Sequence, residues 1–415
     1  MTNPSISRET LAAADAADPL AGFRDEFDLP ENILYFDGNS LGPLPRGTAA
    51  RMEQAITQEW GRDLIGSWNS HDWINLPSRV GDKIARCIGA APGEVVAADS
   101  TSVNLFKLLM AALRLRPGRK TILTETGNFP TDLYVAQGVC DLLGDGHELR
   151  RVPGDEITAS IDDDVALVLV THVNYQTGAM HSLVDITQAA HDAGALMLWD
   201  LSHSAGAVPV VLNLVDADFA VGCGYKFLNG GPGAPAFLFV ASRLQDDIAP
   251  PLSGWMGHEA PFEFADDYRP APGITRNLCG TPSVLGLTAL EAGLDLFLTA
   301  DMMEIRRKSL ALADQFMTLV ATRCAGQGIV IATPRADTRR GSQVSLRHEN
   351  AYPIMQALIA RGVIGDFRAP DTLRFGMAPL YVRHVDIWDA VEHLRDIIET
   401  GDWDRPEFHA RSAVT

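Results

Sequence analysis

Short, continuous apolar runs alternate with amphipathic stretches from about residue 95 onward. The runs are TILTE (121–125), VALVLVTHV (165–173), ALMLWDL (195–201), FAVGCG (219–224) and APAFLFV (234–240). Runs that are apolar throughout, rather than alternating, are typical of strands covered on both faces. The stretches between them, such as SVNLFKLLMAALRL and DITQAAHDAG, have helical spacing. The pattern therefore predicts a doubly wound α/β domain with a mostly parallel sheet.

The two ends of the chain carry a different pattern. Residues 8–28 have helical spacing, and a long helical pattern covers 301–325 before a smaller α+β segment. A chain of 415 residues usually forms more than one domain, so we expect a domain change near residue 300. The expected division is an N-terminal segment that joins the small domain (1–50), a large domain (51–300) and a small C-terminal domain (301–415).

Charge and composition narrow the class of protein. The formal net charge is -19, which argues against nucleic acid or an acidic membrane surface as a partner, because both select Lys/Arg-rich patches. The sequence has no run of 18 or more apolar residues, so we expect no membrane span. The early acidic residues predict no signal peptide. The five cysteines lack metal-binding spacing, so we expect no metal site and reduced thiols in a cytoplasmic protein.

Reactive side chains follow three of the apolar runs. VALVLVTHV ends near Thr171 and His172, ALMLWD ends at Asp200 shortly before His203, and FAVGCGYK ends at Lys226. In an open parallel sheet the ligand crevice lies at the carboxyl ends of the strands, so these side chains should converge. A lone lysine after a strand is usually a surface residue, and a lone aspartate is often a helix cap. The joint pattern is what indicates a functional site.

A lysine and a carboxylate on neighbouring strand ends suit pyridoxal 5'-phosphate (PLP). The lysine would bond to the cofactor aldehyde, and the carboxylate would keep the pyridine nitrogen protonated, so that the ring can accept electrons. The glycines of GCGYKFLNGGPG (222–233) would let the backbone pass close to the cofactor. The residues therefore predict a PLP site built on Lys226 and Asp200.

Two further stretches offer places for the cofactor's phosphate and ring. Thr101 and Ser102 stand at the start of a helical pattern, where hydroxyls and free backbone N–H groups form an anion site. In GNFPTDLY, Phe129 is placed to stack on a pyridine face, with Thr131 and Asp132 beside it. Each stretch alone could equally be an ordinary helix cap or turn.

Seven segments together resemble one enzyme family. They are YFDGNSLGPLPR (35–46), GNFPTDLY (127–134), THVNYQTG (171–178), WDLSHSAGA (199–207), GCGYKFLNGGPG (222–233), SGWMGHE (253–259) and RFGMAPLY (374–381). Through them the chain resembles the bacterial kynureninases, within the class V aminotransferase superfamily of fold-type I PLP enzymes. The resemblance implies the fold-type I PLP-dependent transferase fold: an α/β large domain with a mostly parallel, seven-stranded type of sheet, and a smaller α+β C-terminal domain.

The resemblance also implies a role for each matching residue. Lys226 would be the Schiff-base lysine and Asp200 the partner of the pyridine nitrogen. The position of Tyr225 next to Lys226 suggests, as a separate hypothesis, that Tyr225 shuttles a proton in catalysis. The residues implied around the cofactor are Thr101, Ser102, Phe129, Thr131, Asp132, Thr171, His203, Tyr225, Trp255 and Thr281, the last two as candidates for contribution by a partner subunit. Arg374 would hold the substrate α-carboxylate, although alone it would indicate a surface ion pair. The candidates for the substrate's aromatic end are Asn39, Ser40, His71 and Trp73.

The reaction implied by the resemblance is hydrolysis of L-kynurenine to anthranilate and L-alanine. The alternative substrate is 3-hydroxy-L-kynurenine, which would give 3-hydroxyanthranilate and L-alanine. The family also implies a homodimer with shared active sites. Within the same fold, a cysteine desulfurase or an aminotransferase is the nearest alternative. A desulfurase needs a nucleophilic cysteine on a mobile loop, and Cys324 is the only cysteine late enough in the chain. A catalytically silent PLP-binding protein is the alternative from another class.

Overall fold

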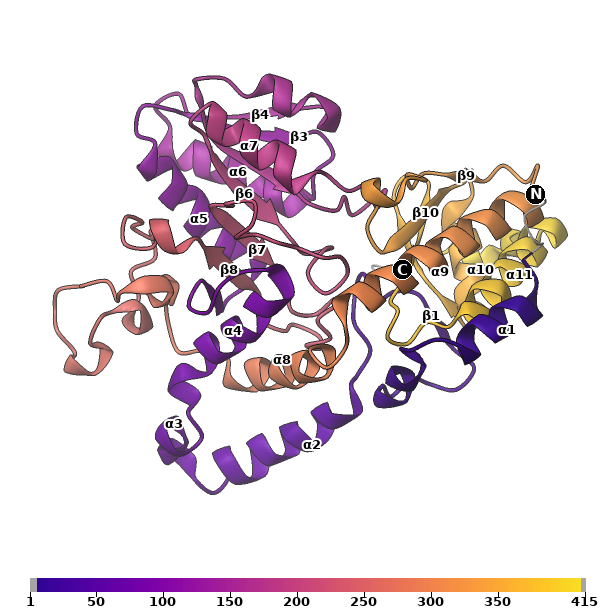
Figure 1. Ribbon diagram of the computed structural model, residues 1–415, viewed down its shortest axis with the longest axis horizontal. Helices are drawn as coiled ribbons and strands as arrows, with labels where there is room; N and C mark the ends of the chain where they lie inside the picture. Colours follow the sequence, from indigo (N-terminus) through magenta and orange to yellow (C-terminus); the bar gives the residue numbers. More distant parts are fainter. Residues whose placement is uncertain (1–5, 412–415) are drawn as a thin grey trace. The chain divides into compact units, whose positions relative to one another are not determined.

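The computed structural model describes residues 6–411, which cluster into two compact units (Figure 1). The large unit consists of Gly47–Asn174 and His181–Leu298. The small unit consists of the chain up to Arg46, the short segment Tyr175–Met180, and the chain from Thr299 onward. Tyr175–Met180 therefore belongs to the small unit, although the chain on both sides of it belongs to the large one. The sequence pattern did not predict that this segment belongs to the small unit.

The large unit is built on one seven-stranded sheet with the order β2-β8-β7-β6-β5-β3-β4. Its strands are β2 (Val95–Ala97), β3 (Thr121–Glu125), β4 (Glu148–Val152), β5 (Val165–Thr171), β6 (Leu196–Asp200), β7 (Phe219–Gly222) and β8 (Phe237–Val240). The pairs among β3, β4, β5, β6 and β7 are parallel, and β8 runs antiparallel to both of its neighbours. The predicted mostly parallel α/β sheet is confirmed.

Helices cover the sheet of the large unit, as the continuous apolar strands require. The helices of this unit are α2 (Arg46–Gln54), α3 (Ser67–Ser70), α4 (Leu76–Ile88), α5 (Thr101–Leu115), α6 (Pro130–Leu143), α7 (Leu183–Asp192) and α8 (Val284–Phe297). Among them, α4, α5, α6 and α7 pack on strands of the sheet. The core forms where α5 packs on the strands: Leu105, Leu108 and Leu109 of α5 share one cluster with Leu167 and Leu169 of β5. This packing fixes the N-terminus of α5 at the edge of the sheet where the parallel strands end.

The small unit has its own α+β core. Its sheet has the order β12-β13-β10-β9, and a separate parallel pair joins β1 to β11. The strands are β1 (Leu34–Tyr35), β9 (Val330–Ile331), β10 (Gln343–Arg347), β11 (Val363–Ile364), β12 (Asp366–Arg368) and β13 (Thr372–Gly376), and the helices are α1 (Arg8–Ala16), α9 (Met302–Arg323), α10 (Ala351–Ala360), α11 (His384–Thr400) and α12 (Pro406–His409). The rings of Phe36, Phe316 and Phe375 pack together, so the N-terminal segment shares a core with α9 and β13.

Some expected boundaries were wrong. The helix expected over 8–28 ends at Ala16, because Pro19 follows its C-cap and the chain continues as a 3-10 turn over Ala21–Glu26. The strand expected from residue 234 begins at Phe237. β4 was missed because its sequence, ELRRV, is polar and only partly buried at the edge of the sheet. Within residues 6–411, none of the helices has both the length and the apolar character that a membrane span requires.

Candidate functional site

The carboxyl ends of the parallel strands surround one cavity in the large unit, of about 220 Å³. β5 ends at Thr171, β6 ends at Asp200, and Lys226 follows β7 by four residues. The cavity is lined by Asp99, Ser100, Thr101, Ser102, Phe129, Thr131, Thr171, Asp200, Ser202, His203, Tyr225, Lys226, Gly233, Ala234 and Ala236. The structure thus brings together most of the side chains that the sequence indicated for a cofactor.

Lys226 is held in a tight, aromatic environment. Its side chain is 9% exposed, and its Nζ lies 2.9 Å from Nε2 of His203. The same Nζ lies 5.9 Å from the ring centroid of Phe129 and 5.9 Å from that of Tyr225. Two residues before Lys226, Gly224 packs against the backbone of Pro235, where a Cβ would come within 2.5 Å of a carbonyl oxygen. The glycine at position 224 therefore allows the close approach that places Lys226 in the cavity.

Two buried carboxylates lie beside Lys226. Oδ1 of Asp200 accepts a hydrogen bond from the Ser202 backbone N–H at 2.7 Å, and Oδ2 of Asp132 lies 3.1 Å from the hydroxyl of Thr171. Burial raises the pKa of Asp200, although the Ser202 hydrogen bonds oppose the shift. Burial, and next the Asp200 charge, raises the pKa of Asp132 well above its usual range. Two buried acids this close to each other are suited to a positively charged group in the cavity.

The N-terminus of α5 gives the cavity a group of donors that suits an anion. α5 starts at Thr101, and its N-cap Ser100 accepts a hydrogen bond from the Val103 N–H at 3.4 Å. The first turn of a helix carries free N–H groups and the positive end of the helix dipole. Thr101 and Ser102 line the cavity at this turn. One cavity therefore combines an amine, the buried Asp200 carboxylate, an aromatic face at Phe129 and an anion-binding helix end, while Asp132 lies outside its lining.

Other expected cofactor and substrate residues of the large unit lie outside the lining of this cavity. Trp255 is 42% exposed and packs against the rings of Phe262 and Phe264. Thr281 is exposed shortly before α8. His71 pairs with Asp63, with Nε2 2.7 Å from Oδ2, and the indole N–H of Trp73 donates to Glu59. The roles expected of these residues remain predictions.

Arg374 lies in the small unit and is 1% exposed. Its Nε donates to Oδ1 of Asp366 at 2.6 Å, and its Nη2 donates to Oδ2 of Asp366 and to the Ser40 hydroxyl. Nη1 donates to the backbone carbonyl of Tyr175 at 2.6 Å. Arg374 is thus a buried ion-pair residue, and Asp366 occupies the fork formed by Nε and Nη2.

The loop from Asp37 to Ser40 adds polar groups to the Arg374 cluster. Asn39 is fully buried, and neither oxygen nor nitrogen of its amide has a hydrogen-bond partner among the described residues. Burial, and next the charge of Asp366, raises the pKa of Asp37 to about 7. Buried polar groups are normally satisfied in folded proteins, so an unpaired Asn39 amide fits a ligand-contacting residue.

Sequence reasoning missed the residues that support the expected ones. Asp366 stands directly opposite Arg374 in the antiparallel β12–β13 pair, but DFR carries no motif and only the strand register shows the pairing. Asn128 accepts a hydrogen bond from the Thr171 hydroxyl. The sequence could have indicated Asn128, because it lies within the motif GNFPTDLY, directly before Phe129.

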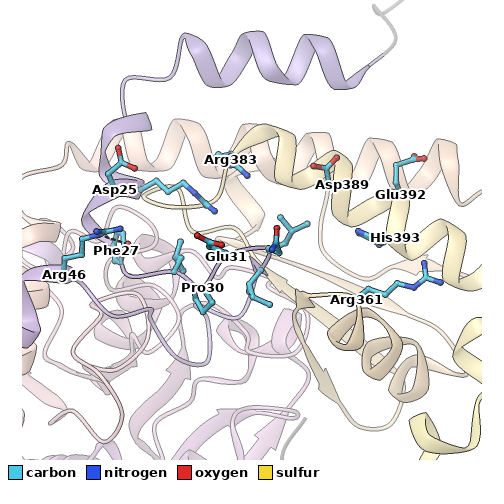
Figure 2. A pocket seen from close by; sticks show the side chains of 15 residues that line it. Asp25, Phe27, Pro30, Glu31, Arg46, Arg361, Arg383, Asp389, Glu392 and His393 are labelled. Carbon is cyan, nitrogen blue, oxygen red and sulfur yellow. Dashed lines mark hydrogen bonds between the residues drawn. The ribbon is translucent and has the colours of Figure 1, made fainter.

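A larger cavity, of about 660 Å³, lies in the small unit (Figure 2). The side chains of Arg361, Arg383 and Glu392 that line it are engaged in ion pairs with neighbouring side chains. Figure 2 shows Asp25 and Glu31 among the same lining residues, so charges of both signs face the space. This cavity lacks the amine, carboxylate and helix-end combination found around Lys226.

The fold is shared with solved structures of cysteine desulfurases. The apo enzyme from Thermococcus onnurineus NA1 superposes with a TM-score of 0.76 at 19% identity, covering 91% of this chain and 98% of that chain. The enzyme from Escherichia coli gives a TM-score of 0.77 at 20% identity, covering 92% of this chain and 98% of that chain. The chain therefore has the fold of the fold-type I PLP-dependent enzymes, as the sequence predicted.

Sequence comparison defines the family within this fold. The chain is 55% identical over 415 residues to a kynureninase from Burkholderia pseudomallei, covering 99% of this chain and 100% of that protein. It is 50% identical over 414 residues to a kynureninase from Pseudomonas fluorescens, covering 99% of this chain and 100% of that protein. The family model of the kynureninase C-terminal domain matches residues 305–394. The chain belongs to the kynureninase family.

Proposed function

We propose that this chain is a PLP-dependent hydrolase that cleaves L-kynurenine to anthranilate and L-alanine. The observation that carries the proposal is the convergence of Lys226, Asp200 and the N-terminus of α5 on one cavity. Membership of the kynureninase family supports the choice of substrate over those of other enzymes with the same fold.

The chemistry of the cavity fits PLP. Thr101, Ser102 and the first turn of α5 would hold the phosphate. Asp200 would face the pyridine nitrogen, because it lines the cavity at the end of β6 and a protonated ring nitrogen would stabilise its buried carboxylate. Phe129 would cover one face of the ring, and Lys226 would attach the cofactor. When bound, PLP withdraws electrons from the substrate Cα and Cβ.

The chain's own groups would supply the proton transfers. Lys226 is proposed to remove the α-proton, as a general base held in place by its contact with His203. Hydrolysis adds water to the γ-carbonyl and breaks the Cβ–Cγ bond, after which Cβ needs a proton. Tyr225 adjoins Lys226 in the same cavity, and burial raises the pKa of its hydroxyl, so that it stays protonated and can donate.

Replacing Tyr225 by phenylalanine tests this proton donor. We expect kcat to fall about 10²-fold, within the usual contribution of a general acid, while the affinity for PLP changes little. Steady-state kinetics and a PLP titration of the apoprotein measure the two effects separately. A Tyr225→Phe variant with wild-type kcat would show that Tyr225 is not the donor.

Arg374 is proposed to bind the substrate α-carboxylate through Nη1, which has a second N–H beyond the one that binds the Tyr175 carbonyl. Replacing Arg374 by lysine should raise KM for kynurenine about tenfold or more and change kcat less, because lysine keeps the charge but loses the planar set of donors. Arg347→Lys is the matched control, since Arg347 is exposed on β10 in the same unit. An unchanged KM in Arg374→Lys would remove Arg374 from the substrate site.

We also propose a homodimer in which Trp255 and Thr281 contribute to the partner's phosphate site. The support is the surface position of the segment that carries them: Trp255, Phe262 and Phe264 form an aromatic cluster that is 42%, 57% and 73% exposed. Sedimentation equilibrium of the purified protein measures the mass, and a monomer would contradict this proposal.

The desulfurase alternative depends on Cys324. That residue is the C-cap of α9 and is 4% exposed, and burial raises the pKa of its thiol to about 11. A nucleophilic cysteine needs access and a lowered pKa. The surroundings of Cys324 therefore weigh against persulfide chemistry at this position.

One experiment tests the proposed function directly. The purified protein is loaded with PLP, its visible absorption spectrum is recorded, and L-kynurenine or 3-hydroxykynurenine is added while the fluorescence of the anthranilate product is followed. A visible band together with anthranilate release is the expected result. The ratio of the cleavage rates of L-kynurenine and 3-hydroxykynurenine gives the substrate preference. A band without either product would reject the hydrolase, and no band at all would reject the PLP site.

A further inference from the structure

Lys107 is a buried cation that the proposed chemistry does not use. It lies in the middle of α5 and is 0% exposed, among the leucines that pack on the sheet. Its Nζ donates to Oδ2 of Asp99 at 2.5 Å and to the backbone carbonyl of Asn277 at 2.6 Å. Burying a lysine ammonium is costly, and an apolar side chain would often stabilise the fold as well, while the partner carboxylate of Asp99 stays partly exposed. Stability alone therefore does not account for a lysine at position 107.

Asp99 connects Lys107 to the cavity around Lys226. It is the residue before the N-cap Ser100, and it lines the cavity. Its backbone has a φ of 53°, in the left-handed region that few residues other than glycine adopt. Its carbonyl accepts a hydrogen bond from Ala236 at 3.0 Å, and Ala236 lines the same cavity. The turn at Asp99 thus sets the direction in which α5 begins.

The Asp99 carboxylate lies close to the helix end proposed for the phosphate, because Asp99 directly precedes the N-cap of α5. A negative charge next to the helix end proposed for the phosphate would repel the phosphate unless it were neutralised. Lys107 supplies a positive charge in direct contact with Asp99. It also joins this turn to the 3-10 turn Gly273–Asn277, which leads toward Thr281. One side chain therefore ties the turn before α5 to the segment that precedes Thr281.

We propose that Lys107 is a positioning residue for the phosphate-binding end of the cofactor site. Acting through Asp99, it holds the turn that aims the first N–H groups of α5, and it cancels a carboxylate charge that would oppose a bound phosphate. This inference rests on the proposed PLP function. It concerns affinity for the phosphate group and not the chemical step.

Lys308 provides a matched control in the small unit. It is 3% exposed on α9, and its Nζ contacts Oδ2 of Asp18 at 2.7 Å and the carbonyl of Pro379 at 2.6 Å. Like Lys107, it is a buried helical lysine bound to one carboxylate and one backbone carbonyl. Replacing either lysine by methionine keeps the approximate shape and removes the charge, so both variants lose a buried lysine's bond to an aspartate, although the Asp99 side chain is 30% exposed and that of Asp18 is 4% exposed.

The test compares PLP with pyridoxal, which lacks the phosphate, in titrations of the apoproteins followed by visible absorption. Lys107→Met should weaken PLP binding about tenfold or more while changing pyridoxal binding less than about twofold, because only the phosphate end is disturbed. Lys308→Met should leave both affinities unchanged. Adding Asp99→Asn to Lys107→Met should recover part of the PLP affinity, since it removes the unpaired carboxylate, and no recovery would overturn the charge-cancelling role.

Equal losses for PLP and pyridoxal, or no loss for either, would overturn the proposal and make Lys107 a purely structural residue. If Lys107→Met does not fold, Lys107→Gln tests the same point, because glutamine is neutral but can still hydrogen-bond. A wild-type protein that binds neither compound would instead reject the proposed function, and this inference with it. The ratio of the PLP affinity to the pyridoxal affinity, measured for each variant and for the wild type, distinguishes a positioning role of Lys107 from a purely structural one.

Discussion

Replacing Lys226 by alanine is expected to lower kcat for kynurenine cleavage by about 10³-fold or more, and to remove the visible absorption of covalently attached PLP. The physical reason is that one amine would perform two tasks, attachment of the cofactor and removal of the α-proton. Nothing nearby can replace it: the closest basic group in the cavity is His203, whose Nε2 is the contact partner of Lys226 Nζ at 2.9 Å.

The measurement pairs an absorption spectrum of the PLP-loaded variant with a kinetic assay. Lys120→Ala is the control, because Lys120 is a partly exposed lysine of the large unit that pairs with Asp145 at the surface, and its loss should change neither result. An active Lys226→Ala protein with an unchanged spectrum would refute both the site and the proposed function.

Replacing Asp200 by asparagine is expected to lower kcat about 10²- to 10³-fold and, in the apoprotein, to raise the free energy of unfolding. The kinetic loss follows from removing the negative charge that would stabilise a protonated pyridine nitrogen. The gain in stability follows from burial: the pKa of Asp200 is raised in the folded state, so its ionisation opposes folding once the pH exceeds the unfolded pKa of about 3.9. Asparagine cannot ionise, yet it can still accept the Ser202 hydrogen bond.

The sign of the change in the free energy of unfolding distinguishes a buried carboxylate that opposes folding from one that stabilises the fold through an ion pair. The gain should be absent near pH 4 and should grow as the pH rises, which urea unfolding of the apoproteins at several pH values would measure. A loss of stability in Asp200→Asn together with full activity would mean that the carboxylate is a structural ion-pair residue.

Asp218→Asn is the matched control for Asp200→Asn. Asp218 is also buried, directly before β7, but hydrogen bonds from His191 and the Met197 N–H outweigh the effect of burial and lower its pKa. Its ionised form therefore stabilises the folded protein above the unfolded pKa, and that contribution is lost as the pH falls. Asp218→Asn should be less stable at neutral pH and retain its kcat. The two buried aspartates should thus respond in opposite directions.

The fold class and the centre of the cofactor site followed from local pattern. Apolar runs marked the central strands, and the reactive residues Thr171, Asp200 and Lys226 lay at or just beyond their ends. Because parallel strands present their carboxyl ends at one edge of a sheet, sequence position was enough to predict that these side chains meet. The structure places them around one cavity. The family resemblance added roles that periodicity does not contain, such as that of Arg374.

Tertiary structure alone decided which groups support those residues. The pairing of Asp366 with Arg374 depends on the register of β12 against β13, and the contact of Lys107 with Asn277 joins positions 170 residues apart. The segment Tyr175–Met180 clusters with the small unit, where its backbone forms hydrogen bonds with residues that include Arg339, Gly341 and Arg374. Local patterns record which face of an element is buried. They do not record which distant side chain completes an ion pair, because that depends on how the elements pack once the chain has folded.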